Sequence, residues 1–337
     1  MPADRARILV TGSGGPAAVI LVRSYNRRRD VTVLAADIDP MAAGLYLVDE
    51  GQRHLLFRGE VPAFVDHLLD LCIRQAVDVL IPTVDSELLP LARRRADFVG
   101  AGIELLCPSV RTLELCLDKA ALARACTGVV PVPRTAVLDH DFDADVWPLP
   151  VICKPRSGSG SRGVVLVNEA RQWGALSREG ELLVQEYLPG EEYSIDVLAG
   201  PDGSVVAAVP RSRLKVDSGI SVAGRTIRDP ELEALGRAVS TAIGLVGVAN
   251  VQARRDMGGR AALLEVNPRF PGAMVLTVGA GIDMPSLVLD AALGLPLPVG
   301  PLPFLEIGVV RYWEEQFVSV EELGALPAPH EALVDRR

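Results

Sequence analysis

The chain has 337 residues, enough for two or three domains of ordinary size. Hydrophobic residues make up 49% of it and charged residues 23%, which is typical of packed cores and excludes a disordered chain. The formal net charge is −9, which disfavours contact with nucleic-acid phosphates or anionic lipid. We therefore expect neither a nucleic-acid partner nor a membrane partner.

No segment has the features of a targeting or membrane-spanning sequence. Residues 1–10 lack the apolar core of a signal peptide, and the most apolar stretch, residues 291–310, carries four prolines that would interrupt a membrane helix. The five cysteines are widely spaced and form no CxxC pair. This usage indicates reduced thiols and a cytoplasmic location.

Only three of the 34 basic residues are lysines: Lys119, Lys154 and Lys215. Because a broad, planar guanidinium cannot replace a compact ammonium at every site, these lysines are candidates for specific roles. Asparagine is also scarce, with Asn250 and Asn267 among four in the chain.

The first 115 residues alternate between strand-like and helix-like segments. Strands are expected at 7–11, 31–36, 78–83 and 103–107, and helices from 16 to about 29, at 67–75 and at 87–95. This alternation predicts a parallel sheet with helices on both faces, whose ligands gather at the carboxyl ends of the strands. Polar residues near those ends are Asp37, Asp39, Asp85 and Glu87.

From residue 118 onward, strand pairs with short loops dominate, which favours antiparallel sheets and an α+β domain. Residues 129–133 are predicted to form a stiff, extended linker. Strands are expected at 151–154, 164–167, 182–186, 193–199, 204–213, 248–254 and 261–266, and helices at 119–125 and 231–243.

A glycine cluster, Gly12-Ser13-Gly14-Gly15-Pro16, follows the first strand, with Ala17 in place of the third glycine of a GxGxxG fingerprint. Such a loop exposes backbone amides to an anion, and Asp37 stands where a ribose-binding acid would be. A tight strand–helix turn without a ligand explains the cluster equally well.

The segment 154–163 (KPRSGSGSRG) joins two apolar strands. Its small residues, including Ser157, Gly158 and Gly160, expose amides that can fold over a polyphosphate, and Lys154 could hold a phosphate. A solvated hairpin loop is the alternative.

The segment 182–193 runs from an apolar strand into a Pro-Gly turn with three acids. Backbone groups at Leu188 could read an adenine, and the acids could hold ribose hydroxyls. An exposed acidic turn is the simpler interpretation of this segment taken alone.

Residues i and i+2 of a strand face the same side, so Glu265 projects with Asn267, and Asn250 with Gln252 on the preceding strand. Carboxylate and carboxamide oxygens suit Mg²⁺, which keeps water and phosphate oxygens in its coordination shell. Arg269 follows directly and could meet an anion beside the metal. The pattern predicts a metal site, although isolated Glu-x-Asn pairs are common.

Three cations, Arg211, Arg213 and Lys215, precede a loop with Gly219 and Ser221. They could bind a transferred phosphate or a substrate carboxylate. A solvated edge strand explains them equally well.

Taken in order, these segments resemble the ATP-grasp superfamily, in particular its carbamoyl-phosphate-synthetase-like, carboxylate–amine ligase branch. The resemblance spans about residues 8–295, and the order and spacing of its motifs are more specific than any single motif. The motifs are Asp118-Lys119, Lys154-Pro155 with the glycine-serine loop, Gln185-Glu186-Tyr187 with Glu192, Asn250-Val251-Gln252, and Glu265-Val266-Asn267-Pro268-Arg269.

The resemblance implies a role for each matching residue. ATP contacts are expected from Lys119, Lys154, Ser157, Gly158, Gly160, Glu186, Leu188 and Glu192. Mg²⁺, or Mn²⁺ in its place, would be bound by Gln252, Glu265 and Asn267, although Gln252 stands where other branches often have Asp. Catalytic roles would fall to Arg269, Lys154 and Lys215, and acceptor-substrate contacts to Asp85, Glu87, Arg211 and Arg213.

The implied fold is an α/β Rossmann-like (pre-ATP-grasp) domain followed by an α+β ATP-grasp fold with antiparallel sheets. We expect the N-terminal domain at 1–115 and a small subdomain with the glycine-rich lid at 116–190. A C-terminal subdomain with the metal site is expected at 191–300, and a C-terminal extension at 301–337.

The implied activity is ATP-dependent ligation of a small, amino-acid-like carboxylate to an amine through an acyl-phosphate, with release of ADP and phosphate. Carbamoyl-phosphate-synthetase-like phosphorylation and ligation to a thiol are alternatives within the superfamily. Outside it, the alternatives are an NAD-dependent oxidoreductase built on the glycine cluster and a non-catalytic nucleotide-binding scaffold. Small-molecule substrates are the expected partners, and a homodimer is compatible with the resemblance.

Overall fold

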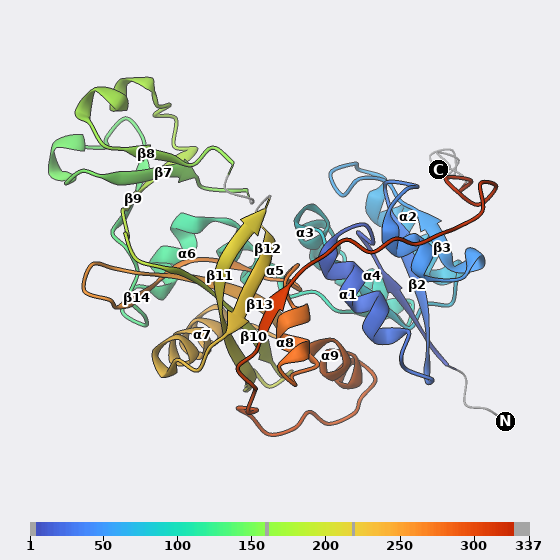
Figure 1. Ribbon diagram of the computed structural model, residues 1–337. Coiled ribbons are helices and arrows are strands. Elements are labelled where there is room, and N and C mark those ends of the chain that lie inside the picture. The colour runs from blue at the N-terminus through green and yellow to red at the C-terminus, as the bar shows by residue number, and fades with distance from the viewer. Residues whose placement is uncertain (1–4, 159–161, 218–219, 327–337) are drawn as a thin grey trace. The chain divides into compact units, whose positions relative to one another are not determined.

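The computed structural model describes residues 5–158, 162–217 and 220–326. This chain divides into two compact units, and many of their elements are labelled in Figure 1. The first contains residues up to 110 together with 269–298 and the stretch from 311, and the second contains residues 111–268 and 299–310. Gly160 and Gly219, two of the glycines noted in the sequence, lie outside the described residues.

The first unit is built on a five-stranded parallel sheet in the order β3-β2-β1-β4-β5. Its strands are β1 Ala6–Val10, β2 Val31–Asp37, β3 Arg53–Leu55, β4 Val79–Ile81 and β5 Glu104–Leu105. The direction of winding changes between β1 and β4, so the crevice outside the carboxyl ends of these two strands is the place where such sheets bind ligands.

Six α-helices accompany this sheet in the described part of the first unit. They are α1 Pro16–Tyr25, α2 Phe64–Arg74, α3 Asp85–Arg93, α4 Arg95–Gly100, α8 Val275–Gly279 and α9 Met284–Ala292. The late helix α9 is tied to the early helix α1, because the Tyr25 hydroxyl donates to the Pro285 carbonyl over 3.1 Å. Arg28 also pairs with Asp290 at 2.6 Å.

The second unit contains a six-stranded antiparallel sheet and a four-stranded antiparallel sheet, in the orders β14-β13-β10-β11-β12-β15 and β6-β9-β7-β8. The larger sheet consists of β10 Glu192–Ala199, β11 Val205–Asp217, β12 Ile220–Thr226, β13 Gly247–Arg255, β14 Ala261–Asn267 and β15 Gly308–Val310. The smaller sheet consists of β6 Thr135–Leu138, β7 Val151–Pro155, β8 Val165–Val167 and β9 Leu182–Glu186. The helices are α5 Val110–Leu117, α6 Lys119–Cys126 and α7 Pro230–Ile243.

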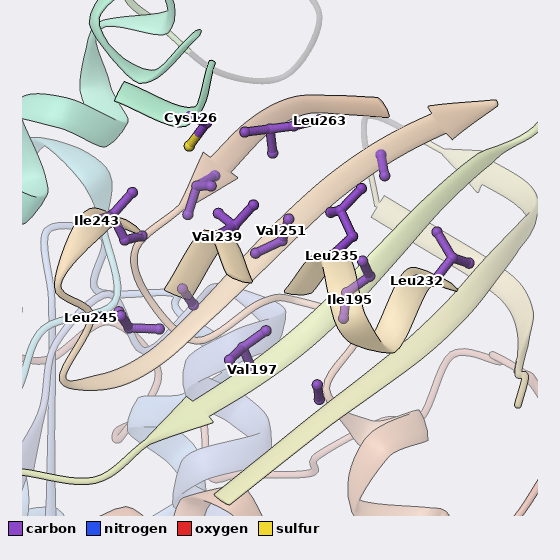
Figure 2. Packing of buried hydrophobic residues seen from close by; sticks show 14 of the residues in the cluster. Cys126, Ile195, Val197, Leu232, Leu235, Val239, Ile243, Leu245, Val251 and Leu263 are labelled. Atoms are coloured by element: carbon purple, nitrogen blue, oxygen red, sulfur yellow. The ribbon is translucent and has the colours of Figure 1, made fainter. Parts of the chain in front are cut away.

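Helix α7 covers one face of the larger sheet, as Figure 2 shows. Its buried side chains recur every three or four residues and meet apolar residues of β10 and β13, where alternate positions point to the helix. The contacting residues include Leu232, Leu235, Val239 and Ile243 of the helix and Ile195, Val197 and Val251 of the strands. Each such side chain stabilises the fold by about 1.5–3 kcal/mol. Because strand residues alternate, the opposite face of the sheet receives the polar residues.

The predicted fold class is confirmed, with a parallel α/β unit first and antiparallel sheets after it. Some boundaries differ from the expected ones. The helix expected at 87–95 is two helices, α3 and α4, because Arg94 leaves the helical conformation at φ −106° and ψ 15°. Strand β11 continues to Asp217, beyond the expected end at 213.

All five cysteines are buried and none is in a disulfide. Within the described ranges, no helix combines the length and the apolar composition needed to cross a membrane.

Candidate active site

A cavity in the second unit is lined by residues of both its sheets and of α6. Nine of the residues predicted to bind ATP or metal line it: Lys119, Lys154, Ser157, Gly158, Glu186, Leu188, Glu192, Gln252 and Glu265. These residues are separated by up to 146 positions in the sequence and come from six different elements and the loops that follow them. The fold therefore brings together motifs that the sequence presents far apart.

Lys119 begins α6 and reaches the glycine-rich loop. Asp118 caps the helix by accepting hydrogen bonds from the Ala120 and Ala121 amides, at 2.9 and 3.2 Å. Its second oxygen pairs with Arg156 at 2.6 Å, which ties the cap to the base of the loop. The Lys119 ammonium donates to the Gly158 carbonyl over 2.7 Å and lies 3.9 Å from the Glu265 carboxylate.

Lys154 lies on β7 and is almost completely buried, with 8% of its surface exposed. Burial lowers the pKa of its ammonium to about 8, a shift that Lys119 reinforces and that Glu265 and Glu192 oppose. The described cavity lining thus contains four cationic side chains and three carboxylates, of Glu186, Glu192 and Glu265. The cations are available to stabilise polyphosphate oxygens.

Several residues of the cavity lining are apolar. Ile152, Val164 and Leu264 line it beside Leu188, which is buried. Glu186 ends β9, and its carboxylate accepts a hydrogen bond from the Arg134 amide over 3.1 Å. Apolar side chains next to residues of the segment after β9 suit a flat heterocyclic base.

Glu192 is the first residue of β10 and lines the cavity. Its carboxylate pairs with the guanidinium of Arg213 on β11. Arg213 is a candidate substrate contact from the sequence, and the structure places it beside the expected ribose acid.

The candidate metal ligands occupy paired positions on β13 and β14. Gln252 is in register with Glu265, and Asn250 with Asn267. Gln252 and Glu265 line the cavity, whereas Asn267 is half-buried and is not among the described lining residues.

The donor set around Glu265 offers one carboxylate and carboxamide oxygens. No cluster of three or more His, Cys, Asp or Glu side chains that could hold a metal occurs in the described part of the chain. Such oxygen donors, with few negative charges of their own, fit Mg²⁺ that takes its remaining ligands from nucleotide phosphates and water.

Arg211 lies inside the protein, with 2% of its surface exposed. Its guanidinium makes two hydrogen bonds to Asp196, at 2.9 and 2.6 Å, and Asp196 also accepts from the Asn250 amide over 2.8 Å. Lys215, by contrast, is exposed on β11. Neither Arg211 nor Lys215 is among the described residues that line the cavity.

Two predicted site residues of the first unit form an ion pair with each other. The Arg269 guanidinium contacts both carboxylate oxygens of Asp85, at 2.6 and 2.9 Å. Asp85 begins α3, directly after the loop that follows β4. This bidentate geometry fixes the plane of the guanidinium.

Glu87 lies in the first turn of α3 and is buried at the carboxyl ends of β1 and β4. Burial raises the pKa of its carboxyl to about 7, although a hydrogen bond from the Thr11 hydroxyl opposes the shift. The Thr83 hydroxyl in turn donates to the Thr11 carbonyl over 2.8 Å.

The side chain of Asp37 holds the glycine cluster and the segment after β2 through backbone hydrogen bonds. Its carboxylate accepts hydrogen bonds from the Gly14 amide at 2.7 Å and the Asp39 amide at 3.0 Å. The acid that an NAD-binding fingerprint would assign to a ribose hydroxyl therefore holds the loop itself.

Two cavity arginines, Arg162 and Arg254, are absent from the residues predicted for the site. Arg254 lies two positions after Gln252 on β13, so the same period-two argument that selects Asn250 and Gln252 would have found it. Arg162 lies in the loop before β8, where no periodicity applies.

Two family models match the chain. One, described as PylC-like, N-terminal domain, matches residues 8–106. The other, described as ATP-grasp in the biosynthetic pathway with Ter operon, matches residues 178–314.

Curated relatives include D-alanine–D-alanine ligases. The ligase of Stutzerimonas stutzeri is 26% identical over 220 residues, covering 56% of this chain and 68% of the ligase. A ligase of Anaeromyxobacter dehalogenans is 32% identical over 168 residues, covering 43% of this chain and 54% of the ligase. The chain thus spans between about half and two thirds of these relatives.

Solved structures with a similar fold include biotin carboxylase from Campylobacter jejuni, with a TM-score of 0.72, 17% identity and coverage of 86% of this chain and 72% of that one. N5-carboxyaminoimidazole synthetase from Staphylococcus aureus, solved with ADP, gives a TM-score of 0.70, 17% identity and coverage of 88% and 79%.

The parallel unit, the paired antiparallel sheets and the two family matches define an ATP-grasp protein. The chain thus contains an ATP-grasp domain. More particularly, it joins a PylC-like N-terminal domain to an ATP-grasp domain of the type found with the Ter operon.

Proposed function

We propose that this protein uses ATP and Mg²⁺ to join a small, amino-acid-like carboxylate to an amine. The observation that carries the proposal is the convergence of Lys119, Lys154, Glu192 and Glu265 on one cavity. The cavity offers cations for the phosphates, apolar side chains for the base and oxygen donors for a metal. The D-alanine–D-alanine ligases among its relatives support a carboxylate and an amine as the reactants.

The proposed reaction has two steps. A carboxylate oxygen of the first substrate attacks the γ-phosphorus of ATP, the bond from that phosphorus to the β–γ bridging oxygen breaks, and ADP leaves. The amine then attacks the acyl carbon, the bond from that carbon to the phosphate oxygen breaks, phosphate leaves, and the nitrogen loses a proton to phosphate or water to give the amide. Phosphoryl transfer of this kind requires alignment and charge neutralisation more than a protein nucleophile.

The residues of the cavity would supply that alignment. Lys154 and Lys119 would bind the phosphates from the β7 and α6 sides, while Leu188 and Glu186 border the base. Glu265, with Gln252 and Asn267, would hold Mg²⁺, which when bound neutralises charge on the β- and γ-phosphates. The loop of Ser157 and Gly158 would cover the phosphates and keep water from the acyl-phosphate.

Other predicted roles belong to the same proposal. Arg269 would steady the acyl-phosphate, with its guanidinium held by Asp85, and Lys215 would supply a further cation. Glu87 would contribute to the acceptor site. We also retain the proposed domain limits of 1–115, 116–190, 191–300 and 301–337, and assembly as a homodimer.

The test is to measure ADP and phosphate release with Mg²⁺–ATP across a panel of amino acids and small carboxylates, each with and without an amine, and to identify the products by mass. The proposal predicts equal amounts of ADP, phosphate and amide for one pair of substrates. Thioester formation would favour a thiol acceptor instead, and release of AMP and pyrophosphate would contradict the acyl-phosphate route.

A further inference from the structure

The acid that lines the cavity at the start of β10 is flanked by an arginine on each neighbouring strand. Glu192 is in register with Arg254 of β13. On the other side, the pairing of Tyr193 with Ser212 sets Arg213 of β11 beside Glu192. All three side chains therefore project from the same face of the larger sheet, the face opposite α7.

The two arginines are used differently. Arg213 is 12% exposed and its guanidinium contacts Oε1 of Glu192, which is 32% exposed. Arg254 lines the cavity, and its Nε donates over 2.8 Å to the carbonyl of Gly190 in the preceding turn. Arg213 thus anchors Glu192 through an ion pair. Arg254 is instead oriented by its hydrogen bond to the turn that contains Gly190.

This anchoring determines where the free oxygen of Glu192 points. A glutamate has three rotatable side-chain torsions, and an ion pair at Oε1 restricts them while leaving Oε2 to accept from a ligand. Within the cavity, the positive charges that compete for Glu192 include Lys154, whose ammonium interacts electrostatically with it, and Arg254, which is in register with it. Without Arg213, Glu192 would be drawn toward these cations and away from a neutral hydroxyl group.

We infer that Arg213 is a positioning residue that holds Glu192 for the ribose hydroxyls of the nucleotide, and that it thereby makes binding depend on those hydroxyls. This inference rests on the proposed use of ATP. It assigns Arg213 to nucleotide selection and not to the carboxylate or phosphate of the acceptor substrate.

The test compares three nucleotides on the whole chain by titration calorimetry with Mg²⁺: a non-hydrolysable ATP analogue and its 2′-deoxy and 3′-deoxy forms. Hydrogen bonds to a charged group predict that the wild type binds at least one deoxy form about tenfold or more weakly than the ribonucleotide. In Arg213→Ala the affinity for the ribonucleotide should exceed the affinity for that deoxy form by less than about threefold. Arg225→Ala, which removes an exposed arginine of the neighbouring strand β12, should keep the wild-type ratio.

Each possible outcome of this comparison either supports or contradicts the inference. An Arg213→Ala protein that still discriminates as the wild type does would overturn the inference, as would a wild type that binds all three nucleotides equally. A wild type that binds none of them would instead refute the proposed use of ATP, on which the inference depends. If Arg213→Ala does not fold, Arg213→Gln gives the same comparison, since it removes the charge and keeps a polar side chain of similar length.

Discussion

At the scale of single residues, the buried ammonium of Lys154 gives the cavity a pH dependence. Its pKa is lowered to about 8, mainly by burial, so near pH 8 the ligand-free protein holds this group only partly protonated. Phosphate oxygens of ATP favour the charged form and would raise the pKa again. Binding should therefore take up a proton in the window above pH 7, and not in more acidic solution.

We expect each molecule of ATP analogue that binds to cause the uptake of about half a proton at pH 8 and almost none at pH 6.5. Calorimetry in buffers of different ionisation enthalpy measures this number directly. In Lys154→Arg the side chain stays charged at both pH values, so the uptake should disappear. Equal uptake by the wild type and Lys154→Arg would show that another group takes the proton.

Glu265 is the carboxylate that faces both lysines and the candidate metal position. In Glu265→Gln we expect turnover to fall about 10²–10³-fold, because a charged oxygen donor is removed where phosphate charge is neutralised. Glu104→Gln, on the exposed position of strand β5, is the matched control and should keep full turnover. Steady-state ADP release measures both variants, and a change below about threefold in Glu265→Gln would reject the role.

At the scale of secondary-structure elements, the glycine cluster after β1 is defined by tight packing against the loop after β4. Gly12 has φ +61°, and a Cβ there would lie 2.4 Å from Cγ2 of Val84 and 2.8 Å from the Thr83 hydroxyl. Gly102 has φ +79°, but no described neighbour lies within 4 Å of the position that a Cβ would take there. Substitutions at the two glycines can therefore be compared, because Gly102 tests the left-handed backbone alone and Gly12 tests the same backbone together with steric overlap.

We expect Gly102→Ala to lower the free energy of unfolding by about 1 kcal/mol and Gly12→Ala by about 2–4 kcal/mol, since the second substitution adds overpacking to the left-handed backbone. Urea denaturation measures both values. Equal losses of unfolding free energy in the two variants would contradict this expectation, because they would mean that the loops after β1 and β4 move apart to accommodate the added methyl group without an energetic cost.

The cap of α6 links a helix end to the base of the glycine-rich loop. Asp118→Asn should retain the cap, because Asn is an equally good N-cap residue, but lose the charge that pairs with Arg156. We expect little change in thermal stability and severalfold weaker ATP binding, because Lys119 and the loop lose their common anchor.

Asp229 provides the matched control, because it caps α7 and pairs with Arg255 but is not a residue of the described cavity lining. Asp229→Asn should leave ATP affinity unchanged. Similar effects of both substitutions on affinity would indicate a general consequence of removing a cap charge.

At the scale of the whole molecule, local periodicity predicted the arrangement of elements well. Alternation indicated that Glu265 projects with Asn267 on one strand and Asn250 with Gln252 on the other, and the register of β13 and β14 places the two pairs side by side. The sequence also predicted a helix at 231–243, where α7 lies. These features depend on residues close in sequence, whose spacing alone determines the side of the element on which they lie.

Partners of charged groups could not be predicted in this way. Arg211 and Arg213 are two residues apart on β11, yet one is buried against Asp196 and the other anchors Glu192. Which carboxylate each arginine meets depends on strand order, since β10 lies next to β11 only in the folded sheet. The Asp85–Arg269 pair joins residues 184 positions apart and has no local signal.

The central claim is that the cavity of the second unit binds ATP with Mg²⁺. A crystal structure with Mg²⁺ and a non-hydrolysable ATP analogue tests it most directly. We predict phosphates in contact with Lys119 and Lys154, the base beside Leu188, and the metal on Glu265. A nucleotide bound instead at the glycine cluster of Gly12–Gly15, with this cavity empty, would contradict the account.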